Sequence, residues 1–171
     1  MCEILAIAPS CGANPPGVTK LYWVATEDVT SFSAVDLEDL SVSTITMASG
    51  KKFQLLGTLK EETSVESEKV GTNDTSSFTH KVIGKIKGQE QAVNAALSKA
   101  VGTAMIVLAQ CSNGDVLIIG DKTNYAELSV LKSMTGKNGG TDRKGSDFEI
   151  VSMGHSILPT YFTGTLATII A

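Results

Sequence analysis

The segment covering residues 53–87 constrains the fold most strongly, because its side chains alternate between apolar and polar over an unusual length. In its first half the odd positions carry Phe53, Leu55, Leu59 and Val65, while most even positions are polar or charged. A period of two predicts a strand with one buried and one exposed face. The second half alternates in the same way, so the two halves predict a β-hairpin. Strands usually run ~5–6 residues, so a pair of this length predicts packing against other copies of the chain.

Two loops are compatible with this hairpin. A two-residue loop at Gly71 and Thr72 fits a type II′ turn, because that turn takes glycine at its first central position. This loop would place Glu62 opposite Lys81 on the exposed face. A wider turn over residues 72–75 is the alternative, since alternation supports the hairpin without fixing its loop.

The remaining segments predict a mainly β (α+β) protein that forms a single domain over residues 1–171. Strands are expected over residues 20–25, 42–47, 103–110, 116–120, 128–134 and 148–153, with a loop and a short turn over residues 28–39. Residues 89–101 predict the one helix, because their apolar side chains recur at helical spacing. Asn113 and Gly114 form a strong hairpin signal between two continuous apolar runs, which we expect at the centre of the core.

Both ends of the chain predict contacts beyond a simple core. Residues 1–17 resemble a secretion signal only superficially, because Glu3 lies where such a signal carries positive charge. We therefore expect an ordered N-terminal arm, packed on its own or a neighbouring subunit. Residues 157–171 form an apolar C-terminal extension, whereas a solvated chain end is usually polar. We expect this extension to cover apolar surface, for instance on a neighbouring subunit.

Motifs for catalysis, metals or cofactors are missing from the sequence. His80 and His155 are the only histidines, and neither has the spacing to a carboxylate or cysteine that a zinc or nucleophile site shows. By parity His80 falls on the buried face of the hairpin. The three cysteines, Cys2, Cys11 and Cys111, lack CxxC spacing, which predicts reduced thiols. We expect no enzyme, no cofactor and no metal.

The composition excludes further classes of partner. The net charge of -4 provides no general attraction to nucleic acid or to an anionic membrane. No segment approaches the ~20 apolar residues that span a bilayer, so no membrane association is expected. Lys137 is followed by Asn138, which departs from the phosphate-loop pattern GxxxxGK[ST].

The order of the expected elements resembles that of tail tube (major tail) proteins of tailed bacteriophages, in particular the tube-type virion proteins of Bacteroidetes phages. Residues 50–53, the Glu-rich strand and residues 107–120 carry this resemblance, which covers roughly residues 18–156. The resemblance implies a β-sandwich or barrel-like fold with a long hairpin and one flanking helix. It also implies rings of six subunits whose inner sheets join around a lumen, and rings that stack into a tube.

The resemblance also implies roles for particular residues. The lumen would be lined by Glu62, Glu66, Glu68, Lys81 and Lys85, and negative charge there would keep DNA from sticking. Alternatively, the face of the hairpin that carries these residues would lie on the outer surface of the ring. Contacts between rings would come from the arm, the glycine-rich loop and the extension, with the expected residues Lys137, Asn138, Arg143, Lys144, Ile157, Leu158, Tyr161 and Phe162.

The function implied is that of a structural virion protein that assembles into a tail tube for DNA ejection. Its partners would be copies of itself, other virion tail proteins and DNA passing without specific binding. It would be assembled in the cytoplasm of the bacterial host and reside in the virion tail. The inner tube of a contractile injection system and a head–tail connector ring are close alternatives. A small β-rich ligand-binding module is an alternative of another class, and an enzyme is a third.

Overall fold

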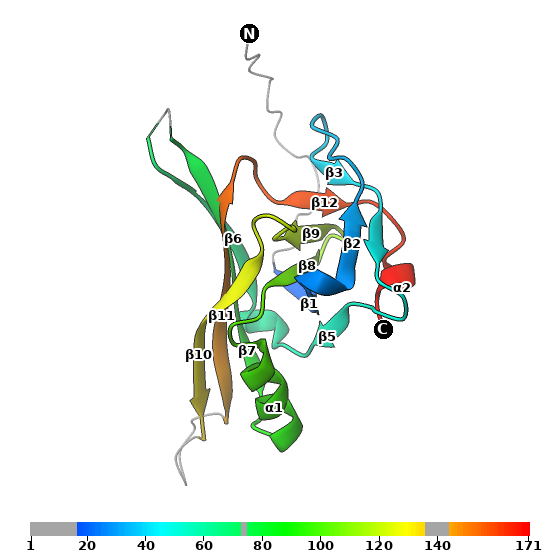
Figure 1. Cartoon of the computed structure of the whole chain (residues 1–171). Helices are drawn as coiled ribbons and strands as arrows, with labels where there is room; N and C mark the ends of the chain where they lie inside the picture. Colours follow the sequence, from blue (N-terminus) through cyan, green and yellow to red (C-terminus); the bar gives the residue numbers. More distant parts are fainter. Residues whose placement is uncertain (1–16, 73–74, 136–143) are drawn as a thin grey trace.

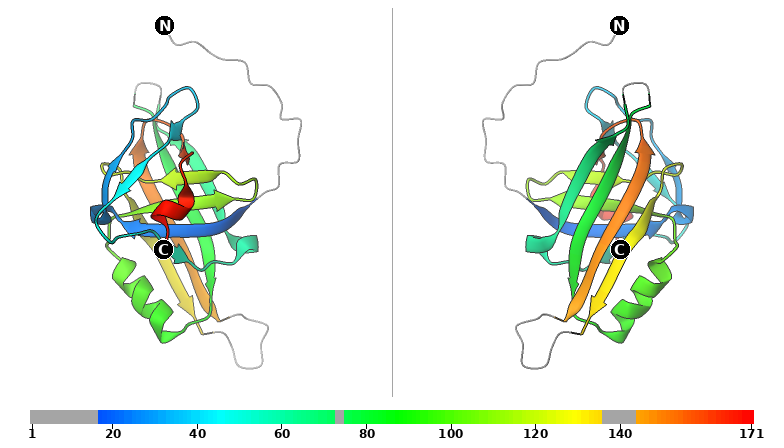
Figure 2. Two further views of the ribbon diagram at one scale, coloured as in Figure 1. Left: turned by 90° about the vertical axis from the view of Figure 1, so that its right-hand side faces the viewer. Right: turned by 90° about the vertical axis from the view of Figure 1, so that its left-hand side faces the viewer.

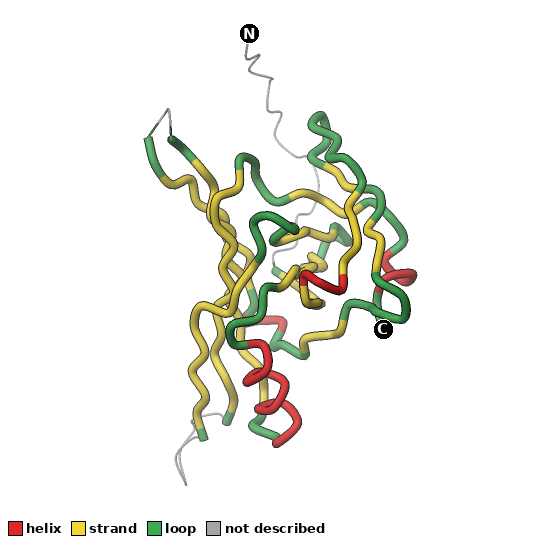
Figure 3. Tube along the Cα trace, viewed as in Figure 1, coloured by secondary structure: helices red, strands yellow, loops and turns green. Residues whose placement is uncertain are grey.

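The computed structural model describes residues 17–72, 75–135 and 144–171, and this part of the chain is mainly β (Figures 1 and 3). One extended sheet and a separate pair, β2–β4, contain all the described strands. The strands are β1 Val18–Ala25, β2 Val29–Phe32, β3 Ser41–Val42, β4 Ile45–Met47, β5 Gln54–Leu56, β6 Ser64–Val70, β7 Ser77–Lys87, β8 Met105–Cys111, β9 Val116–Ile119, β10 Ala126–Met134, β11 Gly145–His155 and β12 Thr160–Phe162. The helices are α1 Gln91–Ala100 and α2 Leu166–Ile169, with 3-10 turns η1 Thr26–Asp28 and η2 Lys60–Glu62.

The strands form layers that cross one another (Figure 2). Strands β6, β7, β11 and β10 lie side by side in that order and form a long antiparallel layer, which we call the blade. Strands β1, β8 and β9 form a central layer that runs across the blade. The two layers belong to one sheet because Ala126 at the start of β10 pairs with Met105 at the start of β8.

The first hydrophobic core lies between the blade, the central layer and α1. Val82 of β7 and Ile150 of β11 are fully buried there, opposite Val107 of β8. Helix α1 adds Leu97 and Ala100, two positions of the expected apolar stripe. The helix is confirmed, and burial of its stripe rather than helix propensity explains its stability.

The second core lies on the opposite face of the central layer. Ile106 and Leu108 of β8 point into it, whereas Val107 points into the first core, so β8 is buried on both faces. A strand covered on both faces is expected to be continuously apolar. The expected central hairpin of β8 and β9 is therefore confirmed, with Gly114 in its turn at a φ of 97°.

The C-terminal extension packs on its own chain. Strand β12 pairs with β9 and with β3, and helix α2 buries Ile169 in the second core. The Phe53 amide donates to the Ile169 carbonyl at 2.8 Å, and the Ala171 amide donates to the Phe53 carbonyl at 2.9 Å. The expectation that the extension covers apolar surface is confirmed, and that surface is the second core of the same subunit rather than a neighbouring subunit. Helix α2 was not expected from the sequence.

The long hairpin exists as β6 and β7, but the two-residue loop is wrong. Glu66 lies opposite Lys81, four positions away from the expected register. The Thr75 amide donates to the Thr72 carbonyl at 3.0 Å, which is the wider turn of the two alternatives. Gly71 precedes this turn at a φ of 94°, where a Cβ would lie 2.5 Å from the Thr75 carbonyl oxygen. The shift is an even number of residues, so every side chain keeps its expected face.

The first strand of the hairpin does not extend back to residue 53. Strand β5 pairs with β1 instead, and η2 separates it from β6. Leu56 is consequently buried whereas Leu55 is 60% exposed, the reverse of the expected alternation. The cause is a non-local pairing partner that local alternation does not reveal.

Residues 28–47 also differ from expectation. The expected loop contains strand β2, which pairs with β4, and the expected strand over residues 42–47 is divided into β3 and β4. The Ser33 hydroxyl accepts the amides of Ser43 and Thr44 at 3.1 and 3.2 Å, and these bonds hold the chain at the break.

Candidate functional site

The face of the blade that points away from the first core gathers the expected lumen residues. Glu66 and Glu68 project from β6, and Lys81 and Lys85 project from β7 on the same side, as their strand register requires. Four of the five expected residues therefore share one exposed surface, which we call the outer blade face.

Glu62 reaches the outer blade face by a different route. It belongs to η2 rather than to a strand, and its carboxylate lies 3.1 Å from the Lys85 ammonium. The expected pairing of Glu62 with Lys81 is therefore wrong. Both partners of the observed pair are substantially exposed, so solvent screening leaves the pair little net stability.

Strands β10 and β11 add side chains that the sequence did not connect to this surface. Their register places Glu127, Lys132, Asp147 and Glu149 on the outer blade face. The exposed apolar residues Ile83, Val130 and Met153 lie among these charges. The alternation of side chains along β10 and β11 indicated that each strand has an exposed face. Only the pairing of β11 with β7 shows that these exposed faces belong to the same surface as Lys81 and Lys85.

Both long edges of the blade are open in the described part of the chain. Strand β6 pairs only with β7, and β10 beyond Ala126 pairs only with β11. Apolar side chains on these edge strands are exposed, with Val70 at 48%, Val130 at 46% and Leu131 at 36%. Unpaired strand edges are templates for pairing with another chain.

The expected inter-ring residues lie in different places. Lys144, Leu158 and Tyr161 are exposed, and Ile157 is partly buried. Phe162 is 7% exposed and packs in the second core, so its expected role in a contact between rings is corrected. Lys137, Asn138 and Arg143, like residues 1–16 of the arm, lie outside the described residues.

A buried polar cluster between the blade and the loop after β9 was missed by the sequence reasoning. Ser152 Oγ lies 2.5 Å from His155 Nε2, and His155 Nδ1 lies 3.8 Å from an Asp121 carboxylate oxygen. The His80 ring stacks beside His155 at 4.4 Å between centroids, and its Nδ1 lies 3.0 Å from the Ser67 hydroxyl. Distant segments meet here, so no local spacing could have indicated the cluster.

This cluster has the order of a serine, histidine and aspartate triad, but its hydrogen bonds favour a structural role. The Ser152 hydroxyl is 0% exposed and donates to the carbonyls of Asn124 and Tyr125, at 2.8 and 3.2 Å. These two carbonyls compete with His155 for the single hydroxyl proton, whereas a nucleophilic serine directs that proton to the histidine. Asp121 caps the turn of residues 121–124 by accepting the Asn124 amide at 2.7 Å.

Burial keeps both rings of the cluster neutral near pH 7. Desolvation and the neighbouring His155 lower the pKa of His80 to about 4, and the backbone of Ile157 opposes this shift only partly. Desolvation also lowers the pKa of His155, against the opposing effect of Asp121. His80 Nε2 has no hydrogen-bond partner among the described residues.

Replacement of Ser152 by alanine is expected to lower the free energy of unfolding by about 1–2 kcal/mol. The physical reason is that two buried carbonyl groups lose a donor. Urea unfolding at pH 7.5 would measure the change. Covalent labelling of Ser152 in the folded protein by a serine-directed fluorophosphonate would contradict the structural role and indicate a nucleophile.

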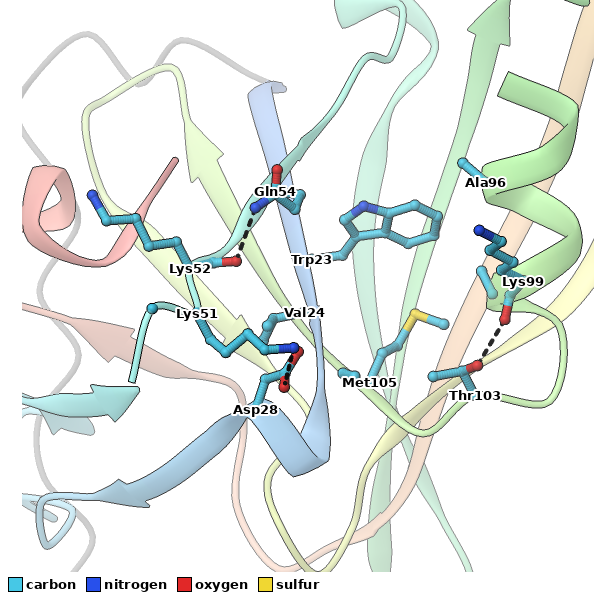
Figure 4. A pocket seen from close by; sticks show the side chains of 13 residues that line it. Trp23, Val24, Asp28, Lys51, Lys52, Gln54, Ala96, Lys99, Thr103 and Met105 are labelled. Atoms are coloured by element: carbon cyan, nitrogen blue, oxygen red, sulfur yellow. Dashed lines mark hydrogen bonds and ion pairs between the residues drawn. The ribbon is translucent and has the colours of Figure 1, made fainter. Parts of the chain in front are cut away.

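A pocket lies between β1, the segment before β5, and α1 (Figure 4). It has a volume of about 460 Å³. The indole of Trp23 stands between β1 and the helix, with Met105 beside it and Ala96 facing it from α1. We call this the tryptophan pocket.

The tryptophan pocket has a positive rim. Lys51 and Lys52 lie on one side and Lys99 on the helix side, against the single carboxylate of Asp28. Lys51 pairs with Asp28 at 3.0 Å, which leaves Lys52 and Lys99 without a carboxylate partner in the described residues. The Lys52 side chain extends away from the indole to the outer part of the rim (Figure 4).

Comparison with protein-family models, with curated protein sequences and with solved structures finds no match to this chain. Within residues 17–72, 75–135 and 144–171, no group of three or more His, Cys, Asp and Glu side chains is placed to hold a metal ion. None of the helices in the described ranges is long and apolar enough to cross a membrane.

Proposed function

We propose that this chain is a structural protein that assembles edge to edge into rings, and that the rings form the tail tube of a bacteriophage. The observation that carries the proposal is the pair of open edges on the blade. Strand β6 and strand β10 run in opposite directions, because each strand of the blade is antiparallel to the next. Strand β10 of one copy can therefore pair with β6 of the next copy as an ordinary antiparallel pair.

Ring closure would remove both edges at once. A closed ring leaves no unpaired strand, whereas a free monomer would expose two edges with apolar side chains beside them. The blade also extends beyond the first core at its edges, since almost every residue of β6 and most residues of β10 are exposed. Edge strands that are exposed on both faces and carry apolar side chains are unusual in a monomer, and they suit a subunit of an assembly.

The dimensions of such a ring suit a DNA conduit. The resemblance to tail tube proteins implies six copies, which would contribute about 24 strands to one barrel. Strands spaced ~4.8 Å apart and tilted by about 40° give a circumference of about 150 Å. The barrel would then be roughly 50 Å across between backbones, before side chains narrow the lumen. The body of each subunit, with its second core, would lie outside this barrel in the sandwich-like arrangement of a tube protein.

The outer blade face would line the lumen, because the opposite face is occupied by the first core. Its carboxylates are Glu62, Glu66, Glu68, Glu127, Asp147 and Glu149, and its lysines are Lys81, Lys85, Lys87 and Lys132. Six negative and four positive charges give a formal charge of -2 per copy. Interspersed charges with a negative excess would let DNA pass without specific binding.

The test is negative-stain electron microscopy of the purified protein, together with its mass in solution. We expect rings or tubes with a central hole, because each copy offers two complementary edges. The mass of an isolated ring would also give the number of copies. A compact monomer at a high protein concentration would overturn the proposal and favour the ligand-binding alternative.

A further inference from the structure

The loop between β2 and β3 presents an apolar side chain on an acidic turn. Residues 35–40, which we call the acidic turn, contain Asp36, Glu38 and Asp39 and no basic residue. Leu37 at its tip is 71% exposed, more than any other large apolar side chain of the described chain.

The acidic turn is held in a defined shape. The backbones of Asp36 and Ser41 exchange two hydrogen bonds, at 2.9 and 3.1 Å, and the Glu38 amide donates to the Asp36 carboxylate at 3.0 Å. Leu40 has a φ of 50°, a conformation that costs free energy in a residue other than glycine. The strained residue is the partly buried Leu40, and the exposed leucine at the tip of the same turn is Leu37. Backbone strain of this kind is concentrated at functional surfaces, which motivates a search for a partner of this turn.

The tryptophan pocket has the complementary chemistry. It offers the indole of Trp23 and the thioether of Met105 to an apolar side chain, and Lys52 and Lys99 to carboxylates. The turn carries a formal charge of -3, while the pocket carries three lysines and one aspartate, a formal charge of +2. Complementary charge of this kind gives an interface its specificity.

The turn and the pocket lie toward opposite ends of the molecule. The loop between β2 and β3 is at the upper end in Figures 1 and 2, whereas α1, which forms one wall of the pocket, is at the lower end. The strands of the blade run from the upper to the lower end. In a ring joined through β6 and β10, all turns would therefore lie on one face and all pockets toward the other.

We infer that the acidic turn of one copy inserts into the tryptophan pocket of a copy in the next ring, with Leu37 beside Trp23. This inference rests on the proposed function, because rings stack through it. A head-to-tail contact between two different surfaces repeats without closing, so it builds a tube of open length. The occupant of the pocket is then a second copy of this chain.

The test compares two charge-reversed variants of the full chain. One double variant, Lys52→Glu with Lys99→Glu, reverses the charge of the pocket. The other, Glu38→Lys with Asp39→Lys, reverses the charge of the turn. Each is expected to form rings but to raise the protein concentration needed for stacking at least tenfold. Mixing the two variants is expected to restore tubes of alternating rings. Leu37→Ser should weaken stacking without unfolding the chain, because Leu37 is already exposed. Lys20→Glu with Lys60→Glu is the matched control for added charge.

Electron microscopy and mass photometry separate the outcomes. If the two charge-reversed variants and Leu37→Ser all form tubes normally, the inference about stacking is wrong. The proposed formation of rings would be unaffected by that result. Reversed variants that form rings but fail to stack when mixed would also overturn it. If removal of residues 1–16 stops stacking while the turn variants stack normally, the N-terminal arm is the occupant and the inference is wrong. Linear chains without rings, sensitive to the same substitutions, would support the contact and contradict the proposed function.

Discussion

Replacement of Leu131 by glutamate on the open edge of β10 is expected to abolish ring formation. Leu131 is exposed in the monomer and lies opposite Phe148, on the inner face of the blade. In the proposed ring, the β6 strand of the next copy would cover it with the face that carries Val65. Burying an unpaired carboxylate there would weaken each lateral contact by about 2–4 kcal/mol, or roughly 30- to 1000-fold. Mass in solution and electron microscopy would measure the loss.

The matched control for this change is Leu55→Glu. Leu55 is also an exposed leucine on a strand, but β5 lies in the body of the subunit rather than at an edge of the blade. Both substitutions should leave the monomer folded, since surface changes usually alter stability by less than about 0.5 kcal/mol. Wild-type rings from the Leu131 variant would exclude lateral pairing through β10.

Acid is expected to destabilise the folded chain through its buried histidines. Unfolded histidine binds a proton near pH 6.5, whereas folded His80 binds it only near its pKa of about 4. Between these pH values the unfolded state binds more protons, so stability is present above pH 6.5 and is lost as the pH falls toward 4. The total loss from His80 is about 3 kcal/mol, of which about 2 kcal/mol is lost by pH 5. His155 adds to the loss in the same direction, because its pKa is also lowered.

Urea unfolding at pH 7.5, 6 and 5 would measure this dependence, and a His80→Asn variant is its control. The asparagine amide can replace the ring nitrogen that faces Ser67 and does not titrate in this range. The variant is expected to be less stable at pH 7.5 but to lose less stability between pH 7.5 and 5 than the wild type. Equal slopes in both proteins would show that the carboxylates, rather than His80, cause the acid sensitivity.

Local sequence signals predicted the parts of the fold whose partners are close in the chain. Asn113 and Gly114 predicted the β8–β9 hairpin because the turn and both strands are adjacent. The stripe of α1 was visible because the spacing of its apolar residues repeats within three turns. The faces of β6 and β7 were also predicted correctly, although their register was wrong, because a shift by an even number of residues preserves the side-chain period.

Non-local partners explain what the sequence did not predict. Residues 54–56 alternate like an extension of β6, yet they pair with β1. The paired residues Trp23 and Gln54 are more than thirty positions apart in the sequence. The C-terminal extension is apolar because it covers the second core, which composition alone could not distinguish from cover for another subunit. Ser152, His155 and Asp121 meet only because a bulge in β11 turns His155 inward.

The even number of strands in the blade has a consequence for how such a subunit could change during evolution. Because the first and last strands run in opposite directions, the seam between two copies of the proposed ring would be an antiparallel strand pair, like those within a copy. Gain or loss of a whole hairpin would change the width of the barrel and preserve this seam. Gain or loss of a single strand would make the edges parallel and the seam unlike every other pair. We therefore expect natural variants of this fold to differ in width by pairs of strands.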